Sequence, residues 1–314
     1  MESLDKIIRI AKEFKGFSRK IEIGNIVKIF GNIEYDDAGI IDIDDYHIVV
    51  STDGITEDLV VVDPWFAGYY SVLVNVNDVI VKGAKPIGYV NVLSGPREIR
   101  DKIAKGIKEG LEKYGIRLLK GHTHPDTSYS AIDAAVIGIA KKIVRGTTAK
   151  PPQKILMVVD INGSFIKKGW VRCFDTTINK SSKEIQEMIS AIIYFIENGD
   201  VKCSKDVSAP GILGSLAMLC EASNVGAVVH LDKIPIPKDI SITEWLISYP
   251  AMGFIFGIIE DREFHILEEA GFSVECIGEF TEDNKLKVEY KGLEYTFMDF
   301  SKESVIGLKS SESS

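Results

Sequence analysis

Short apolar runs of strand length alternate with amphipathic helical segments along the whole chain, and this alternation limits the fold more than any other feature of the sequence. The strand-like runs are rich in Val and Ile, and turn-forming residues separate them from their neighbours. Because the alternation continues through both halves, each half is expected to be α/β or α+β. Strands are expected at 47–52, 59–63, 130–144, 154–161, 227–231, 251–259 and 273–280.

Three longer segments carry helical signals. Residues 65–86 form an uninterrupted apolar stretch closed by Gly and Pro, which suits a buried helix better than a strand. Residues 101–114 place their apolar side chains on one face. The stretch 181–199 begins with Ser181 and Glu184 at the spacing of a capping box. These segments are expected to cover the sheets that the strands form.

Length and charge exclude several classes of protein. With 314 residues the chain is expected to contain two domains, 1–150 and 151–314, divided in a stretch of linker composition, RGTTAKPPQ. The net charge of -9 and the lack of a basic cluster argue against a nucleic-acid partner. No apolar run approaches the roughly 20 residues of a membrane span. The charged N-terminus predicts an amphipathic helix and not a signal peptide. The four cysteines lack CxxC spacing, which suggests neither a zinc knuckle nor a disulfide framework. A cytoplasmic protein with buried thiols and no membrane contact is therefore expected.

Carboxylates stand at the ends of apolar segments in four places, namely Asp36 with Asp37, Asp53, Asp78 and Asp206. Each one alone would be explained as a turn or helix cap. Asp78 lies inside an otherwise apolar segment, where an unpaired carboxylate is costly, so a positive partner is expected beside it. Asn75 is three residues earlier and would share a helical face with Asp78, as two oxygen ligands for one cation. Mg²⁺ binds few carboxylates and otherwise uses water and phosphate oxygens, so scattered aspartates and a nucleotide make a consistent set of ligands for it.

The segment KGHTHPDTSYSAIDAAVIG allows three interpretations. His122, His124 and Asp126 follow the HxHxD pattern of zinc-dependent hydrolases, although the next residue is not the third histidine of those enzymes. The segment would equally suit a polar loop ahead of a buried strand. Gly121 and Thr123 would also suit a loop that gives amide and hydroxyl donors to phosphate.

Taken in order, these motifs resemble those of the aminoimidazole ribonucleotide (AIR) synthetase-like superfamily. The sequence contains DDAGII, STDG, NVNDVIVKGAKPIG, KGHTHPDTSYSAIDAAVIG and KDVSAPGILGSLAMLCEASNVGAVVHLDKIPIP between about residues 30 and 280. The superfamily also includes selenophosphate synthetase, thiamine-monophosphate kinase and a hydrogenase maturation factor that dehydrates a carbamoyl group. Within it, the chain most resembles an AIR synthase-related marker family of methanogens.

The resemblance implies a two-domain α/β (α+β) fold and a homodimer, in which the N-terminal sheets of two subunits join in a barrel and each C-terminal domain is α/β. It implies ATP in the cleft between the domains, with its phosphates bridged to Mg²⁺. By position, the resemblance assigns the metal to Asp37 with its neighbour Asp36, and to Asp53, Asp78 and Asp206. It matches Asn75 to an asparagine of the motif that contains Asp78, and Gly121, His122 and Thr123 to a loop near the nucleotide. The candidate nucleotide-binding residues are therefore Asn75, Gly121 and Thr123, with Lys120 beside them in the loop, and His122 becomes the candidate for a polarising or proton-transferring group.

Several residues depart from the pattern of the superfamily. Lys120 replaces the first glycine of the loop, Asn77 replaces the serine before Asp78, and Lys82 stands where an apolar residue is usual. Lys82 and Lys120 are expected to be solvated surface lysines, with phosphate or substrate contacts as the alternative. The absence of any cysteine before Cys173 disfavours selenophosphate synthesis, and the C-terminus lacks the cysteine of the carbamoyl-dehydrating factor.

The expected function is that of an ATP- and Mg²⁺-dependent enzyme that phosphorylates or activates an oxygen atom of a small-molecule substrate. Phosphoryl transfer depends largely on positioning and on neutralising charge, so aspartates that hold metal suffice without a protein nucleophile. The alternatives are a nucleotide-binding scaffold without turnover and a zinc-dependent hydrolase. The acceptor stays open, because substrate contacts in such folds come from variable loops.

Overall fold

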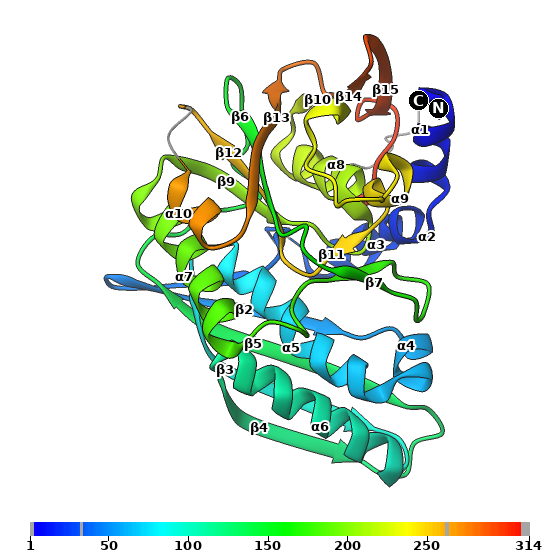
Figure 1. Cartoon of the computed structure of the whole chain (residues 1–314), viewed down its shortest axis with the longest axis vertical. Coiled ribbons are helices and arrows are strands. Elements are labelled where there is room, and N and C mark those ends of the chain that lie inside the picture. The colour runs from blue at the N-terminus through cyan, green and yellow to red at the C-terminus, as the bar shows by residue number, and fades with distance from the viewer. Residues whose placement is uncertain (1–2, 32–33, 261–263, 309–314) are drawn as a thin grey trace.

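The computed structural model describes residues 3–31, 34–260 and 264–308, and these residues form a five-stranded, a seven-stranded and a small three-stranded β-sheet, with helices packed against the two larger ones (Figure 1). The chain begins with four short helical elements, α1 (Leu4–Glu13), α2 (Lys15–Ser18), η1 (Arg19–Ile21) and α3 (Glu22–Phe30). The first sheet and its helices follow, with β1 (Gly39–Ile43), β2 (Tyr46–Gly54), α4 (Glu57–Val62), α5 (Pro64–Ile80), β3 (Lys85–Ser94), α6 (Arg97–Tyr114), β4 (Arg117–His124) and β5 (Ala131–Ala140).

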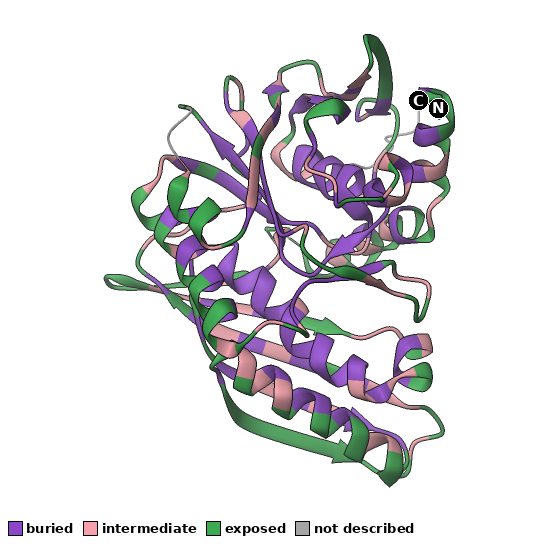
Figure 2. Ribbon diagram, viewed as in Figure 1, coloured by how far each residue is buried: buried purple, intermediate pink, exposed green. Residues whose placement is uncertain are grey.

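The first sheet has five strands in the order β1-β2-β5-β3-β4, and it is open within one chain. Helices α5 and α6 pack against each other beside this sheet, with α5 in contact with β2, β3 and β5. The edge strand β4 is exposed along its whole length and runs beside α6 at the bottom of Figure 2. Two strands, β5 and β3, separate β2 from β4, which places them about 14 Å apart at the usual strand spacing.

The apolar stretch at 65–86 is a helix, as the sequence predicts, because its start is well capped. The Asp63 carboxylate accepts a hydrogen bond from the Phe66 amide at 3.1 Å, and Pro64 occupies the first helical position. Nearly every residue of α5 is buried, so its valines are stabilised by packing on all sides despite their modest helix propensity. At φ +90°, Gly83 then turns the chain toward β3.

The strand predicted at 59–63 is wrong, because Glu57–Val62 forms helix α4. The Thr56 carbonyl accepts hydrogen bonds from the amides of Leu59 and Val60, which closes the first helical turn. These two side chains are buried, whereas Val61 and Val62 are exposed, so burial does not alternate as it would in a strand. Burial on one side of a short helix therefore outweighs the β propensity of a valine run.

The second half of the chain contains a seven-stranded sheet in the order β15-β14-β10-β13-β6-β12-β9 and a small sheet in the order β11-β8-β7. The strands are β6 (Lys154–Val159), β7 (Ser164–Ile166), β8 (Cys173–Asp175), β9 (Val201–Asp206), β10 (Gly226–His230), β11 (Tyr249–Pro250), β12 (Gly253–Ile258), β13 (Ser273–Thr281), β14 (Lys285–Tyr290) and β15 (Leu293–Asp299). The helices are α7 (Ser182–Asn198), α8 (Gly211–Ser223), η2 (Leu231–Lys233), α9 (Ile242–Leu246) and α10 (His265–Glu269). Apart from 59–63, each predicted strand and helix coincides with one of these elements, and the capping box of α7 is present.

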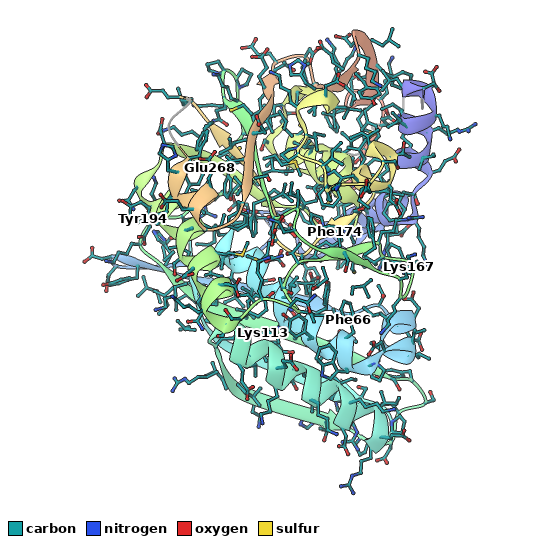
Figure 3. All side chains as sticks on the ribbon, viewed as in Figure 1. Phe66, Lys113, Lys167, Phe174, Tyr194 and Glu268 are labelled. Carbon is teal, nitrogen blue, oxygen red and sulfur yellow. The ribbon has the colours of Figure 1, made fainter. Side chains whose placement is uncertain are left out.

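Both faces of the seven-stranded sheet are covered, and successive residues of β6 point to opposite faces. Leu156 and Val158 belong to a core cluster that includes α5 and α7, whereas Met157 and Val159 belong to a second cluster that includes α1 and α8. Phe66 on α5 and Phe174 on β8, labelled in Figure 3, lie in the first and second cluster respectively. Helix α1 thus packs on the C-terminal half of the chain, although it precedes the first sheet.

The four cysteines are free thiols, and three of them are buried, as expected. In the described ranges, no helix combines the length and the apolar character that crossing a bilayer requires.

Candidate active site

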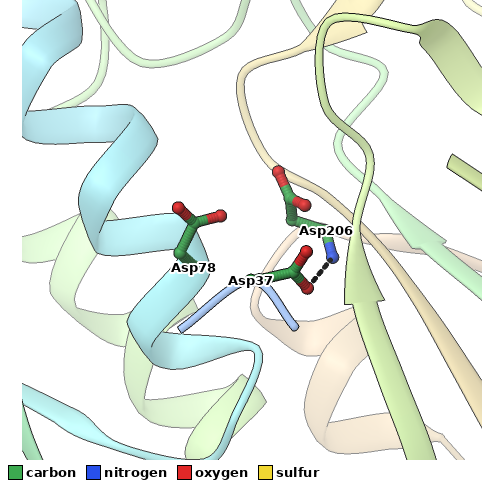
Figure 4. A group of neighbouring side chains, drawn as sticks. All are labelled: Asp37, Asp78 and Asp206. Atoms are coloured by element: carbon green, nitrogen blue, oxygen red, sulfur yellow. Dashed lines mark hydrogen bonds between the residues drawn. The ribbon is translucent and has the colours of Figure 1, made fainter. Parts of the chain in front are cut away.

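Three carboxylates from distant parts of the chain converge between the two sheets. Asp37 follows α3, Asp78 lies in the last turns of α5, and Asp206 ends β9 (Figure 4). Each offers an oxygen within 4.8 Å of the others, and no other group of His, Cys, Asp or Glu side chains converges in this way among the described residues. The Asp206 amide donates to Asp37 Oδ2 at 3.4 Å. This acid triad presents only oxygen ligands, the donor set that hard divalent cations such as Mg²⁺ prefer.

Two buried lysines neutralise much of the negative charge around the triad. Lys82 Nζ lies 2.5 Å from Asp36 Oδ1 and 3.0 Å from Asp37 Oδ2, and it donates to the Ser204 carbonyl at 2.9 Å. The expectation that Lys82 is a solvated surface lysine is therefore wrong, because its side chain has no exposed surface. Lys205 Nζ pairs with Asp37 and lies 3.3 Å from Asp206 Oδ1. A lysine ammonium thus sits between two members of the triad.

The three carboxylates differ in their affinity for protons. Burial raises the pKa of Asp37, but the opposing charges of Lys205 and Lys82 are stronger and lower it to about 2. Burial raises the pKa of Asp206 to about 6 against the attraction of Lys205. Burial, followed by the charges of Asp206 and the other nearby aspartates, raises the pKa of Asp78 well above its usual range. Of the three carboxylates, Asp78 is therefore the one whose surroundings most favour the protonated form.

Asn75 and Ser51 form a buried polar network around Asp78. The Ser51 hydroxyl lies 2.6 Å from Asp78 Oδ2 and 3.3 Å from Asn75 Oδ1, and the Asn75 amide donates to the Ser71 carbonyl. The structure therefore brings Asn75 beside Asp78, as their spacing on a helix predicts. Ser51 fixes the orientation of the carboxylate.

Asp36 and Asp53 lie near the triad but are not members of it. The Asp36 carboxylate faces Lys82 and accepts a hydrogen bond from the Gly146 amide at 2.7 Å, so it ties the segment after β5 to the site. Asp53 is the next-to-last residue of β2 and lines the neighbouring cavity together with Asp206. Asp36 thus balances Lys82, while Asp53 stays available to a ligand in the cavity.

The β4 residues predicted to contact the nucleotide lie away from the acid triad in the structure. Lys120, Gly121, His122 and Thr123 are exposed on the outer strand β4 of the five-stranded sheet, and two strands, β5 and β3, separate them from β2 and Asp53. The His122 and His124 rings lie edge to face with centroids 4.7 Å apart. These residues do not join the acid triad within one chain.

The exposed histidines also bear on the zinc alternative. His122, His124 and Asp126 are all exposed and do not form one of the converging ligand groups of the described residues. A zinc site of the HxHxD type thus finds no geometric support in this chain.

Sequence reasoning missed Lys205, Ser51 and the cavity beside the triad. The sequence offered one indication that Lys205 is buried, because it lies two residues after Cys203 in a strand whose apolar positions are buried. A lysine at such an alternate position needs a carboxylate nearby. Ser51 carried no comparable signal.

The fold and the buried acid triad define a two-domain α/β class of protein, and the comparisons specify the family. Residues 35–140 match the family model described as AIR synthase related protein, N-terminal domain, and residues 175–291 match the C-terminal domain of the same family. The chain belongs to the AIR synthase-related family, as the sequence motifs predict.

Relatives extend over most of the chain. An uncharacterised protein of Methanocaldococcus jannaschii is 36% identical, over 97% of this chain and 99% of that protein. A selenide, water dikinase of Haemophilus influenzae is 29% identical over 66% of this chain and 62% of its own length. Among solved structures, PurL of Thermotoga maritima complexed with ATP has a TM-score of 0.77 at 20% identity, covering 96% of this chain and 52% of PurL. At that identity the match shows the shared fold.

Proposed function

We propose that this chain is an ATP- and Mg²⁺-dependent enzyme that transfers a phosphoryl group to an oxygen atom of a small molecule. The observation that carries the proposal is the convergence of Asp37, Asp78 and Asp206 from three distant segments beside a cavity. Kinship with a dikinase and the fold shared with an ATP-complexed protein support it. Clustered buried carboxylates that cost stability are typical of a functional site.

The residues of the triad fit Mg²⁺ by the chemistry of their donor atoms. All three ligands are carboxylates, and the ammonium of Lys205 between Asp37 and Asp206 is a cation drawn to the same place. We assign Asp37, Asp78 and Asp206 to the metal, with Asp53 beside them in the cavity. When bound, the ion would neutralise charge on the phosphate oxygens.

The side chains of this chain would act by binding and orienting the reactants. Lys82 holds Asp37 in place through a buried ion pair, and Ser51 holds Asp78 through a hydrogen bond. Cys173 lines the cavity, but burial and the charge of Asp175 raise the pKa of its thiol to about 12, so it is not a nucleophile. Direct transfer between bound nucleotide and acceptor therefore needs no covalent enzyme intermediate.

A homodimer is part of the proposal. The edge strand β4 is exposed and carries Leu118 and Leu119 with about half of each side chain accessible, which is unusual for an unpaired edge. Pairing of the five-stranded sheets of two copies would cover these residues. It would also give Lys120, Gly121, His122 and Thr123 a nucleotide to contact, since the acid triad of their own chain is distant.

A binding protein without turnover is the second candidate function. The observation in its favour is the pair of buried lysines, because Lys82 and Lys205 already supply positive charge beside the triad. Such a site could hold the phosphates of a nucleotide with less need for metal.

Calorimetry and a turnover assay separate the two. The enzyme proposal expects Mg²⁺ to strengthen binding of a nonhydrolysable ATP analogue, the substitution Asp78→Ala to abolish this gain, and ADP release with a suitable hydroxyl or carboxyl compound. Asp126→Ala, an exposed acid outside the triad, is the matched control and should change neither result. Binding that ignores Mg²⁺, without ADP release over a broad panel, would favour the scaffold, and absence of nucleotide binding would remove both candidates.

A further inference from the structure

A cavity of about 170 Å³ opens beside the acid triad, and its walls differ in character. Its lining combines two carboxylates, Asp53 and Asp206, with two cations, Arg19 and Lys20. The rest is largely apolar and aromatic, with Tyr70, Trp170 and Tyr249 among its walls. An engineered cavity of about 150 Å³ holds a benzene molecule, so this one has room for a compound about the size of a single ring. That is smaller than the roughly 300–1,000 Å³ of pockets for larger ligands such as a whole nucleotide.

The N-terminal helical elements place two cations in this cavity. Arg19 and Lys20 belong to η1, and the Arg19 guanidinium lies 5.3 Å from the ring centre of Trp170, another residue of the cavity wall. Neither residue makes an ion pair with a carboxylate in the described part of the chain. Arg19 and Lys20 therefore lie beyond ion-pair distance of the cavity carboxylates, which leaves their hydrogen-bond donors open to a ligand in this protein of net charge -9.

The charges and the hydrogen-bonding groups of the cavity both favour an anionic ligand. Arg19 and Lys20 balance Asp53 and Asp206 in the free protein. A divalent cation at the triad would leave an excess of positive charge in the same space. Tyr249 is 96% buried at the cavity wall, and its hydroxyl accepts from Asn77, so no described residue takes its proton. The walls thus offer cations and a hydroxyl donor to an anion.

We propose that the phosphoryl acceptor is a small compound with an anionic group of its own, a carboxylate or a phosphate, which Arg19 and Lys20 bind in this cavity. The inference rests on the proposed function, because it treats the cavity beside the triad as the acceptor site. The anionic group contacts the guanidinium and the ammonium, and the remaining body of the compound packs against the aromatic walls. The oxygen to be phosphorylated then faces Asp53 and Asp206.

Fluorine NMR with small fluorinated probes tests this proposal without knowledge of the natural substrate. The probes are 4-fluorobenzoate and 4-fluorophenyl phosphate, with 4-fluorobenzyl alcohol as the neutral counterpart, each titrated into the full chain saturated with Mg²⁺ and a nonhydrolysable ATP analogue. At least one anion should bind at least 10-fold more tightly than the alcohol. The stronger of the two identifies the anionic group as carboxylate or phosphate.

Variants assign the effect to the two cations. Arg19→Gln and Lys20→Gln should each weaken binding of the anion about 10- to 100-fold, because each removes a charged hydrogen-bond donor. Lys15→Gln is the matched control, since Lys15 lies 5.0 Å from the same Trp170 ring but does not line the cavity, and it should change binding less than 2-fold. Thermal melting of each variant verifies that it is folded.

Several results would overturn the proposal. They are failure of both anions to bind the wild-type chain, equal binding of the neutral alcohol, displacement of the anions by the nucleotide, or a loss in Arg19→Gln and Lys20→Gln of nucleotide affinity instead of probe affinity. Nucleotide binding is measured separately by calorimetry. Its absence in the wild-type chain would refute the proposed function, whereas normal nucleotide binding with no anion site would refute only this inference.

Discussion

Removing the positive charge of Lys82 is expected to destabilise the protein more than any surface substitution. The side chain is fully buried and contacts Asp36, Asp37 and the Ser204 carbonyl. In Lys82→Met, an apolar side chain of similar length fills the space, so little packing is lost, but two buried carboxylates lose their shared partner. Breaking a buried ion pair from one side costs about 3–5 kcal/mol. Against a total stability of roughly 5–15 kcal/mol, this is a large fraction.

Differential scanning fluorimetry in EDTA measures the effect. At about 2–4 °C per kcal/mol, the melting temperature of Lys82→Met should fall by about 6–20 °C. Lys102→Met is the control, since it breaks an exposed pair with Glu98 and should cost at most about 0.5 kcal/mol. The double variant Asp36→Asn with Lys82→Met removes one charge of each sign and keeps an oxygen for the Gly146 amide, so it should recover about 0.5–3 kcal/mol relative to the sum of the single variants.

Two results would refute this reasoning. A melting temperature of Lys82→Met within 2 °C of the wild type, a margin of about 1 kcal/mol, would mean that the aspartates lose nothing when the lysine is removed. Strict additivity in the double variant would mean that Asp36 and Lys82 do not stabilise each other. Added Mg²⁺ provides an internal comparison, because a cation at the triad should stabilise Lys82→Met more than the wild type.

Four further predictions follow from the same structure. Asp78→Asn should leave the metal-free melting temperature within a few degrees of the wild type, because the amide resembles the protonated acid, while calorimetry should show at least a 10-fold loss of affinity for Mg²⁺-nucleotide. In EDTA, the wild-type melting temperature should fall as the pH rises from about 4 to about 6, because folded Asp206 retains a proton that the unfolded chain has released, and Asp206→Asn should flatten this slope. Gly106→Ala should destabilise by about 1–3 kcal/mol or more in chemical denaturation, since its Cβ would lie 1.9 Å from the Trp65 carbonyl oxygen, and Gly110→Ala, with nearest contacts at 3.0 Å, should cost less. If the sheets pair in a homodimer, Leu119→Asp should convert the dimer to a monomer in light scattering, and a wild-type monomer would remove that part of the proposal.

The sequence predicted the fold well where local and global preferences agree. Asp63 and Pro64 begin α5, and Gly115 ends α6 in a left-handed conformation, so these helices could be located from their ends. The error at 59–63 arose where the two preferences conflict. Four consecutive residues, Leu and three valines, favour a strand locally, but only Leu59 and Val60 meet the core. Which side of a short segment meets a core is a tertiary fact that periodicity cannot supply.

The candidate site was less predictable than the fold, and the lysines show why. An aspartate at the end of a strand suggests a ligand site by its position alone, so Asp53 and Asp206 could be selected from the sequence. Lys82 has no such signal, because its partners Asp36 and Asp37 are more than forty residues away and meet it only after both sheets form. Similarly, the placement of His122 depends on strand order, which puts β3 and β5 between β4 and β2.

The two lysines also change what metal binding must accomplish at this site. Asp36, Asp37, Asp78 and Asp206 would carry four negative charges; Lys82 and Lys205 offset two of them, and the raised pKa of Asp78 favours a proton on a third. The negative charge of the metal-free site is therefore reduced by groups of the chain itself. A divalent cation that uses all three triad carboxylates must remove the Asp78 proton and separate Lys205 from Asp37 or Asp206. Its affinity should therefore rise with pH and depend on a second anion that takes over the ammonium, which is a role the phosphates of a nucleotide can fill.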